Sequence, residues 1–152
     1  MGLQIACQDV DRTLCFVVFG ALSGHLDSLA QYVRAKAVRR NRILIDIRGV
    51  SKRPAADNVF IHALKYPSTC SCNIALLDCQ ENRTFCLLCE RLLQTRGYQV
   101  CAFSNEETAW EWLLTGRTQS TRKGCVYLTR HILAKIKHWL NPMRLSHVTP
   151  SS

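Results

Sequence analysis

The strongest pattern in the chain is a short apolar run near its centre, in the stretch RILIDIRGVS (residues 42–51). Positions 43–47 are all Ile or Leu except Asp46. A run that is apolar at consecutive positions is typical of a strand that is buried on both faces of a sheet. Gly49 and then the polar segment 51–54 follow this run. We therefore predict that the strand ends here, in a loop that opens a helix.

The positions around this strand predict a hairpin and further strand–helix units. Residues 3–8 alternate between apolar and polar side chains, residues 13–19 are mostly apolar, and a tight turn at 9–12 separates them. Ser104 and Glu107 have the spacing of a capping box, which marks the start of the last helix. We expect strands at 3–8, 13–19, 42–50, 72–77 and 100–103, and helices at 26–40, 55–64, 82–96 and 104–115. The inward face of the helix at 82–96 is predicted to contain Phe85, Leu88, Cys89, Leu92 and Leu93.

This order predicts the α/β class, with a mixed β-sheet that starts with the hairpin and continues with parallel strands. About four helices belong to this domain, which we expect to span residues 1–116. Residues 117–125 are predicted to be a linker, residues 126–140 a basic amphipathic helix, and residues 141–152 a disordered tail.

Composition and charge refine this prediction. The chain has 152 residues, of which 47% are hydrophobic, and no apolar run approaches the length of a membrane-spanning helix. The first residues lack the pattern of a secretory signal, and the nine cysteines are odd in number. We therefore expect reduced thiols and a cytoplasmic location. The net charge is +2 over residues 1–116 (13 basic, 11 acidic) and +7 over residues 117–152 (7 basic, none acidic).

The basic helix at 126–140 permits three interpretations. Its apolar stripe could pack on the domain or on a second copy in a homodimer, or the helix could lie on an anionic membrane at the inner face. Nucleic acid is a less favoured partner, because the helix has no recognised binding motif. The residues that we expect to act in docking are Arg130, Lys135, Lys137 and Trp139.

The strand order, the segment VVFG at residues 17–20 and the central LIDIRGV at residues 44–50 resemble the STAS fold. That family includes bacterial anti-sigma-factor antagonists and the cytosolic domains of sulfate transporters. The segment FSNEETAWEWL at residues 103–113 is similar to the end of its uncharacterised stand-alone bacterial branch. The resemblance covers about residues 3–114, and it implies a regulatory domain that binds another protein.

In the antagonists, the loop after the central strand carries a phosphorylated Ser or Thr. The matching position here is Ala56, which has no hydroxyl group, and the following glycine position is Asp57, which supplies a fixed negative charge. The resemblance therefore implies protein binding without phosphorylation at this position. The predicted partner-binding residues are Asp46, Ser51, Lys52, Arg53, Ala56 and Asp57.

Two features have both a functional and a purely structural interpretation. Asp46 is either a site carboxylate at the end of the strand or a carboxylate that is hydrogen-bonded to backbone amides and fixes the turn. Cys86 and Cys89 form a Cys-x-x-Cys pair, which suits a metal or a redox site. The alternative is that both are core residues, which is favoured because no second ligand pair appears at the usual spacing; we expect no metal and no cofactor.

Three functional hypotheses follow. The first is a non-enzymatic regulatory module that binds a protein partner through the loop and the helix after Asp46. The second is a protein that binds a small apolar ligand or a lipid between its sheet and its helices, held at the membrane by the basic helix. The third is an enzyme, which is disfavoured because no nucleophile elbow and no phosphate-binding loop is present.

Overall fold

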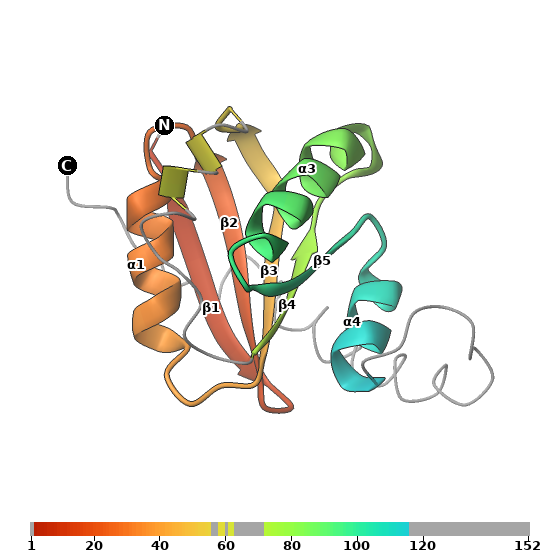
Figure 1. The fold of residues 1–152 in the computed structure, drawn as a ribbon. Coiled ribbons are helices and arrows are strands. Elements are labelled where there is room, and N and C mark those ends of the chain that lie inside the picture. Colours follow the sequence, from red (N-terminus) through yellow and green to blue (C-terminus); the bar gives the residue numbers. More distant parts are fainter. Residues whose placement is uncertain (1, 56–57, 60, 63–71, 116–152) are drawn as a thin grey trace.

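The computed structural model describes residues 2–55, 58–59, 61–62 and 72–115. Five strands form a single sheet in the order β1-β2-β3-β4-β5 (Figure 1). β1 pairs with β2 in antiparallel fashion, and the other neighbours are parallel. The predicted α/β class and the mixed sheet are thus confirmed. The strands are β1 (Gln4–Val10), β2 (Thr13–Ala21), β3 (Arg42–Lys52), β4 (Asn73–Leu77) and β5 (Gln99–Phe103).

Helices cover both faces of the sheet. The helices are α1 (Leu26–Lys36), the short 3-10 helix η1 (Gln80–Asn82), α3 (Arg83–Gln94) and α4 (Glu106–Thr115). α1 and α3 pack on one face with the apolar side chains of β2 and β3, whereas Trp110 and Leu113 of α4 pack on the opposite face. Of the helix that the sequence predicts at 55–64, only residues 58–59 and 61–62 are described, and these are helical.

The β1–β2 connection is tighter than the sequence pattern predicts. β1 continues to Val10, whose side chain is buried, and Val10 is in register with Thr13. The two turn residues, Asp11 and Arg12, both have positive φ angles, of 48° and 62°. This is the geometry of a two-residue hairpin turn, which matches the right-handed twist of the flanking strands.

β3 is longer than predicted and contains two irregularities. The register against β2 shifts between Asp46 and Gly49, and again between Val50 and Lys52, so that β3 has one extra residue at each point. The backbone carbonyl of Lys52 then accepts hydrogen bonds from the N–H groups of Leu22 and Ser23, at 2.9 and 3.1 Å. The prediction of a loop from residue 51 was therefore wrong, because these bonds hold the strand in place to Lys52.

Gly49 is required by a close approach between β3 and β2. A Cβ atom at this position would lie 2.5 Å from Cδ1 of Phe19, a separation that side chains do not tolerate. The glycine at this position therefore allows the ring to lie against the backbone of β3.

Two details of the helices differ from the predictions. The buried thiol of Cys86 lies on the inward face of α3, whereas Leu88 is 42% exposed, so this face is rotated from the predicted one. α4 is capped by Asn105 and not by Ser104, because Asn105 Oδ1 accepts from the N–H groups of Glu107 (2.8 Å) and Thr108 (3.2 Å).

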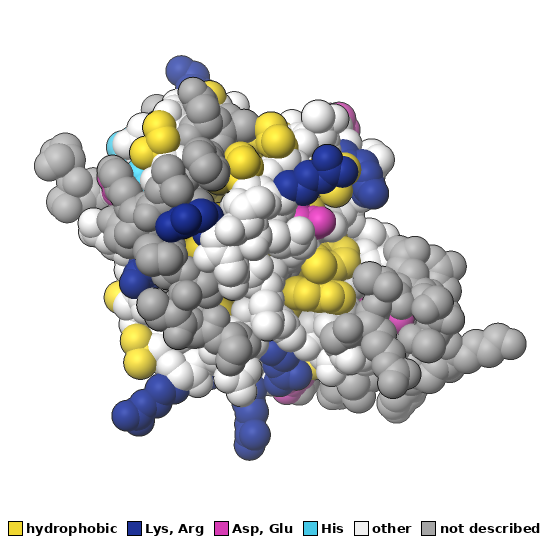
Figure 2. Space-filling view, viewed as in Figure 1, with side chains coloured by type: hydrophobic (Ala, Val, Ile, Leu, Met, Phe, Trp, Pro, Cys, Tyr) yellow, Lys and Arg dark blue, Asp and Glu magenta, His cyan; other side chains and the backbone are white. Residues whose placement is uncertain are grey.

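The surface has an uneven distribution of charge. On the face shown in Figure 2, Lys and Arg side chains project from the periphery of the molecule, and few acidic side chains are visible. Among the described residues, none of the helices has both the length and the apolar character that crossing a bilayer would need.

Candidate functional site

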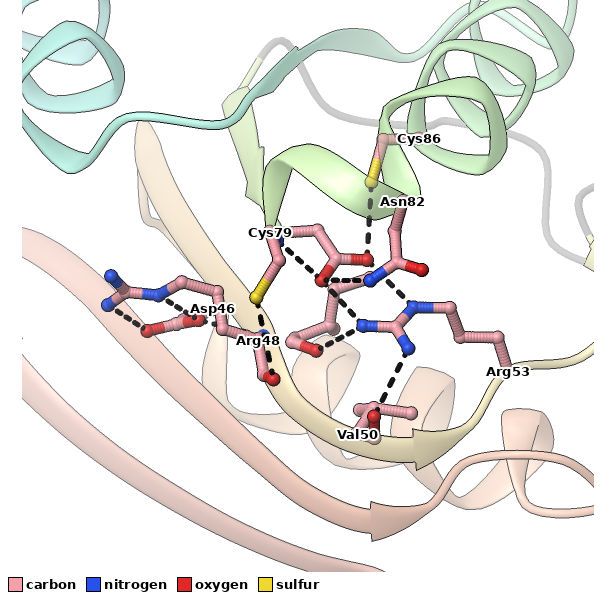
Figure 3. A network of polar contacts seen from close by, with 9 residues as sticks. Asp46, Arg48, Val50, Arg53, Cys79, Asn82 and Cys86 are labelled. Carbon is pink, nitrogen blue, oxygen red and sulfur yellow. Dashed lines mark hydrogen bonds and ion pairs between the residues drawn. The ribbon is translucent and has the colours of Figure 1, made fainter.

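The carboxyl ends of β3 and β4 meet in a network of polar contacts, which is shown in Figure 3. Arg53 follows β3 directly, and Asp78 follows β4 directly. The two form a bidentate pair, in which Arg53 Nε donates to Asp78 Oδ2 at 2.8 Å and Nη2 donates to Oδ1 at 2.5 Å. Adjacent parallel strands bring their carboxyl ends to one edge of the sheet, and for this reason residues 25 positions apart meet here.

The remaining contacts of Asp78 satisfy a carboxylate that is only 1% exposed. Oδ1 accepts from the backbone N–H of Cys79 at 2.7 Å and lies 3.4 Å from Nδ2 of Asn82. The thiol of Cys86 donates to Oδ2 at 3.5 Å. A buried charge persists in a protein when it is paired and hydrogen-bonded, and Asp78 meets both conditions.

Arg53 also donates hydrogen bonds to backbone carbonyls near the end of β3. Its Nη1 donates to the carbonyl of Val50 and its Nη2 to the carbonyl of Ile47, both at 3.2 Å. The hydrogen bonds with Asp78 raise the pKa of the Arg53 guanidinium, although partial burial opposes this effect. Arg53 was predicted as a partner-binding residue. In the structure its donor groups bond to Asp78 and to two backbone carbonyls of β3.

Asp46 lies within β3, inside the strand that the sequence predicts at 42–50, and not at the strand's end as its functional interpretation required. Its side chain is buried, and Oδ1 accepts from the backbone N–H of Arg48 and from Arg48 Nε, each at 3.0 Å. Oδ2 accepts from Arg48 Nη2 at 2.7 Å. The irregular register at this point frees the N–H of Arg48 from the ladder, and the carboxylate of Asp46 replaces the lost partner.

Arg48 also connects β3 to α4. Its Nη2 lies 3.6 Å from Oε1 of Glu106, in the first turn of α4. The hydrogen bonds with Asp46 raise the pKa of Arg48, against the opposing effect of its burial. Asp46 and Arg48 therefore hold together the sheet and the helix on its second face.

The other predicted site residues have different positions. Ser51 and Lys52 are exposed at the end of β3, where they are accessible to a partner. Ala56 and Asp57 lie outside the described residues. The predicted linker, basic helix and tail also lie outside them, together with the docking residues Arg130, Lys135, Lys137 and Trp139.

Cys86 and Cys89 are both buried on α3. Burial, followed by the negative charge of Asp78, raises the pKa of each thiol to about 12. A thiol in this state is a poor nucleophile and a poor metal ligand near neutral pH. Among residues 2–55, 58–59, 61–62 and 72–115, no group of three or more His, Cys, Asp or Glu side chains could hold a metal ion.

A separate feature lies between the sheet and its helices α1 and α3. It is a cavity of about 210 Å³, with α1 on one wall, α3 on another, and strands β3, β4 and β5 as its floor. The lining is almost entirely apolar. It includes Leu26, Leu29, Ala30 and Val33 of α1, Phe85, Cys89 and Leu93 of α3, Ile45, Ile47, Ile74, Leu76 and Val100 of the sheet, the helical residue Val59, and Leu22, Pro54 and Tyr98 from connecting segments.

Two polar side chains, Arg34 and His62, complete the lining of this cavity. His62 Nδ1 lies 2.8 Å from Oδ1 of Asp27, which makes an ion pair whenever the imidazole is protonated. This contact links α1 to the helical residues at 61–62. Two polar side chains therefore lie in an otherwise apolar lining.

Sequence reasoning did not identify Asp78 as a partner of Arg53. The available signal was an acidic residue after one buried strand and a basic residue after its neighbour, at the same edge of a parallel sheet. Most of the residues that line the cavity are apolar and lie in segments that the sequence predicts as strands and helices. Their failure to fill the space depends on side chains from several segments, and a periodic pattern does not contain that information.

No family model matches the chain, and no curated protein matches its sequence. Its fold is similar to the crystal structure of an uncharacterized protein from the DUF3478 family, which has a SpoIIAA-like fold and comes from Shewanella loihica PV-4. The two chains are 18% identical, with 74% of this chain and 94% of that chain covered and a TM-score of 0.49. SpoIIAA-like is another name for the STAS-like fold that the sequence resembles. This similarity concerns the fold alone.

Proposed function

We propose that this protein is a non-enzymatic binding module that holds a small, neutral, apolar molecule in the cavity between its sheet and helices α1 and α3. The observation that supports this proposal is a partly open space of about 210 Å³ that is lined by apolar side chains. Apolar cavities of about 150 Å³ remain free of water and bind molecules such as benzene. A water molecule needs two or more polar partners, which most of this lining does not provide.

The size and the lining of the cavity restrict the chemistry of the ligand. By comparison with a benzene-sized cavity, this one accommodates roughly eight to ten non-hydrogen atoms. A charged ligand would lose its hydration against an almost wholly apolar wall, which costs several kcal/mol for each ion. The favoured class is therefore a small hydrocarbon-like or aromatic molecule.

Binding of naphthalene, a neutral aromatic probe with ten carbon atoms, tests the proposal. We expect saturable binding to the full chain in a ligand-detected NMR titration. For a ligand of this size, about 0.5 kcal/mol per non-hydrogen atom gives a Kd on the order of 0.1–0.3 mM.

Two matched variants on α1 make this test specific. Ala30 lines the cavity, whereas Ala35 is exposed on the same helix. Ala30→Phe places a ring in the cavity and is expected to weaken naphthalene binding at least about tenfold, a change of about 1.4 kcal/mol. Ala35→Phe changes helix propensity by the same amount and should bind like the parent chain. Equal binding by both variants, or none by the parent, would rule out the cavity as the site.

A second candidate function is supported by a separate observation. Ser51 and Lys52 are exposed at the end of β3, where hydrogen bonds from Leu22 and Ser23 to the Lys52 carbonyl fix the backbone. A rigid, accessible strand end suits a regulatory protein partner, as the STAS-like resemblance implies. Pro54, only two residues further along the chain, lines the cavity, so this surface and the cavity are neighbours.

Charge reversal at this surface tests the second candidate. A protein captured by the full chain from native lysate should be lost on Lys52→Glu and retained on Arg83→Glu, an exposed change on α3. Retention by the Lys52→Glu variant would count against this surface. Thermal unfolding of each variant tests whether the domain remains folded.

A further inference from the structure

Basic side chains are concentrated at the end of the domain where the β1–β2 turn and the α1–β3 connection lie. We call the surface formed by residues 9–12 and 36–42 the basic end. It contains five basic residues (Arg12, Lys36, Arg39, Arg40, Arg42) and two acidic ones, Asp9 and Asp11. Its net charge is +3, and the remainder of residues 1–116 has a net charge of −1. Figure 2 shows Lys and Arg side chains projecting at the lower end of the molecule, where Figure 1 places these two connections.

Contacts between the two connections make the basic end a single, ordered surface. Arg40 forms an ion pair with Asp9, and Arg42 Nη2 donates to the backbone carbonyl of Asp11 at 2.9 Å. Both contacts join the segment 40–42, which leads into β3, to the β1–β2 hairpin. The turns of the two connections therefore keep a fixed position relative to each other.

Two arginines remain available on this surface. Arg12 and Arg39 are both exposed, and neither forms an ion pair within the described residues. Both have positive φ angles, of 62° and 63°, at the tips of their connections. Their guanidinium groups are accessible to an external anion, and arginine suits phosphate recognition because its planar group donates in a bidentate manner.

An exposed apolar side chain lies among these charges. Val38 is 66% exposed, more than Ile61, Leu87 and Leu88, which are the other exposed large apolar side chains among the described residues. In the chain it stands between Lys36 and Arg39. In water this exposure is unfavourable, but at the boundary between phospholipid headgroups and acyl chains it becomes favourable.

We propose that the basic end docks on an anionic phospholipid bilayer, with Arg12 and Arg39 on lipid phosphates and Val38 inserted between headgroups. Positive charge close to an anionic leaflet attracts a protein over about a Debye length, and an inserted apolar side chain adds to this attraction. Single-stranded nucleic acid suits the surface less well, because residues 9–12 and 36–42 contain no aromatic side chain on which a base could stack.

Vesicle flotation of the full chain tests this proposal, with phosphatidylcholine vesicles that contain or lack phosphatidylglycerol. The double variant Arg12→Glu/Arg39→Glu is expected to bind the anionic vesicles at least about tenfold more weakly than the parent chain. The matched control, Arg83→Glu/Arg91→Glu, has the same change in net charge at exposed positions of α3, outside the basic end. It should lose less than about twofold, because electrostatic attraction to a membrane is local.

A second pair of variants separates insertion from charge. Val38→Ser should weaken binding to anionic vesicles, whereas Leu88→Ser, which removes an exposed apolar side chain from α3, should not. Circular dichroism shows whether each variant is folded. Equal losses in the two charge-reversal variants, or no binding by the parent chain, would overturn the proposal. Arginine-dependent binding of an oligonucleotide without vesicle binding would also overturn it, in favour of a nucleic-acid surface.

Discussion

At the scale of single residues, two buried carboxylates organise the centre of this protein. Asp78 is neutralised by Arg53 from the neighbouring strand, and Asp46 by Arg48 two positions along the same strand. Asp78 is the more demanding case, because it is almost completely buried and depends on a residue that is distant in sequence. Removing Arg53 would leave this charge without its only cationic partner in the described part of the chain.

We therefore expect Arg53→Met to destabilise the domain by about 2–4 kcal/mol, because breaking a buried ion pair leaves an uncompensated charge. Arg53 is itself 18% exposed at its side chain, which places the expected cost toward the lower part of the usual range. Urea unfolding followed by circular dichroism measures the change in the free energy of unfolding.

The neighbouring Lys52 provides the control for this prediction. Its side chain is exposed, so Lys52→Met should change the free energy of unfolding by no more than about 0.5 kcal/mol. The double variant Arg53→Met/Asp78→Leu removes both charges and should recover part of the stability that Arg53→Met loses. Similar costs for Arg53→Met and Lys52→Met would show that the pair contributes little.

The thiols of α3 permit a test that depends on pH. Burial raises the pKa values of Cys86 and Cys89 to about 12, so that at pH 8 roughly one molecule in ten thousand carries a thiolate at either position. Iodoacetamide should therefore leave both residues unmodified in the native protein at pH 8 and modify both in denaturant, as measured by mass spectrometry of peptides. Rapid modification of either cysteine in the native state would contradict the conclusion that both thiols are buried and protonated.

At the scale of secondary-structure elements, the start of α4 shows how a sequence signal can identify a helix end and choose the wrong residue. Ser104 has the correct spacing to Glu107 for a capping box. Asn105 nevertheless supplies the cap, because its carbonyl oxygen reaches two free N–H groups of the first turn. Both are favoured capping residues, and the choice depends on where the backbone of β5 ends.

We expect Asn105→Ala to destabilise the domain by about 1 kcal/mol, because two N–H groups lose their acceptor. Ser104→Ala should have an effect below about 0.5 kcal/mol. Thermal unfolding of the two variants, compared with the parent chain, measures the difference. The reverse order of costs would assign the cap to Ser104.

The strands were predictable to different degrees. Runs of Ile, Leu and Val identified β2, β3 and β4, because burial on both faces requires continuous apolar positions. The irregular register of β3 was not predictable, since it depends on the separation from β2 and on the Phe19 ring beside Gly49.

At the scale of the whole molecule, the order of elements was sufficient to predict a mixed sheet with an initial hairpin. Local patterns determine which segments are strands, and general rules of chain connection then restrict their arrangement. The cavity could be identified only from the three-dimensional structure. Its volume results from side chains of α1, α3 and three strands that approach one another without filling the space, and most of these side chains look like ordinary core residues in the sequence.

The cavity and the basic end use different residues, so each can be tested without the other. None of the residues at 9–12 or 36–42 lines the cavity. A variant that fills the cavity should therefore bind vesicles like the parent chain. A variant with reversed charge at the basic end should likewise retain the apolar probe.

The most direct test of the central claim is to locate naphthalene within the full chain by NMR, using isoleucine methyl labels. Ile45, Ile47 and Ile74 line the cavity, whereas Ile61 is 47% exposed and outside it. We predict intermolecular nuclear Overhauser effects between naphthalene protons and the methyl groups of these three residues, and none to Ile61. Contacts with Ile61 alone, or with none of the methyl groups, would show that the protein does not hold a ligand between its sheet and its helices.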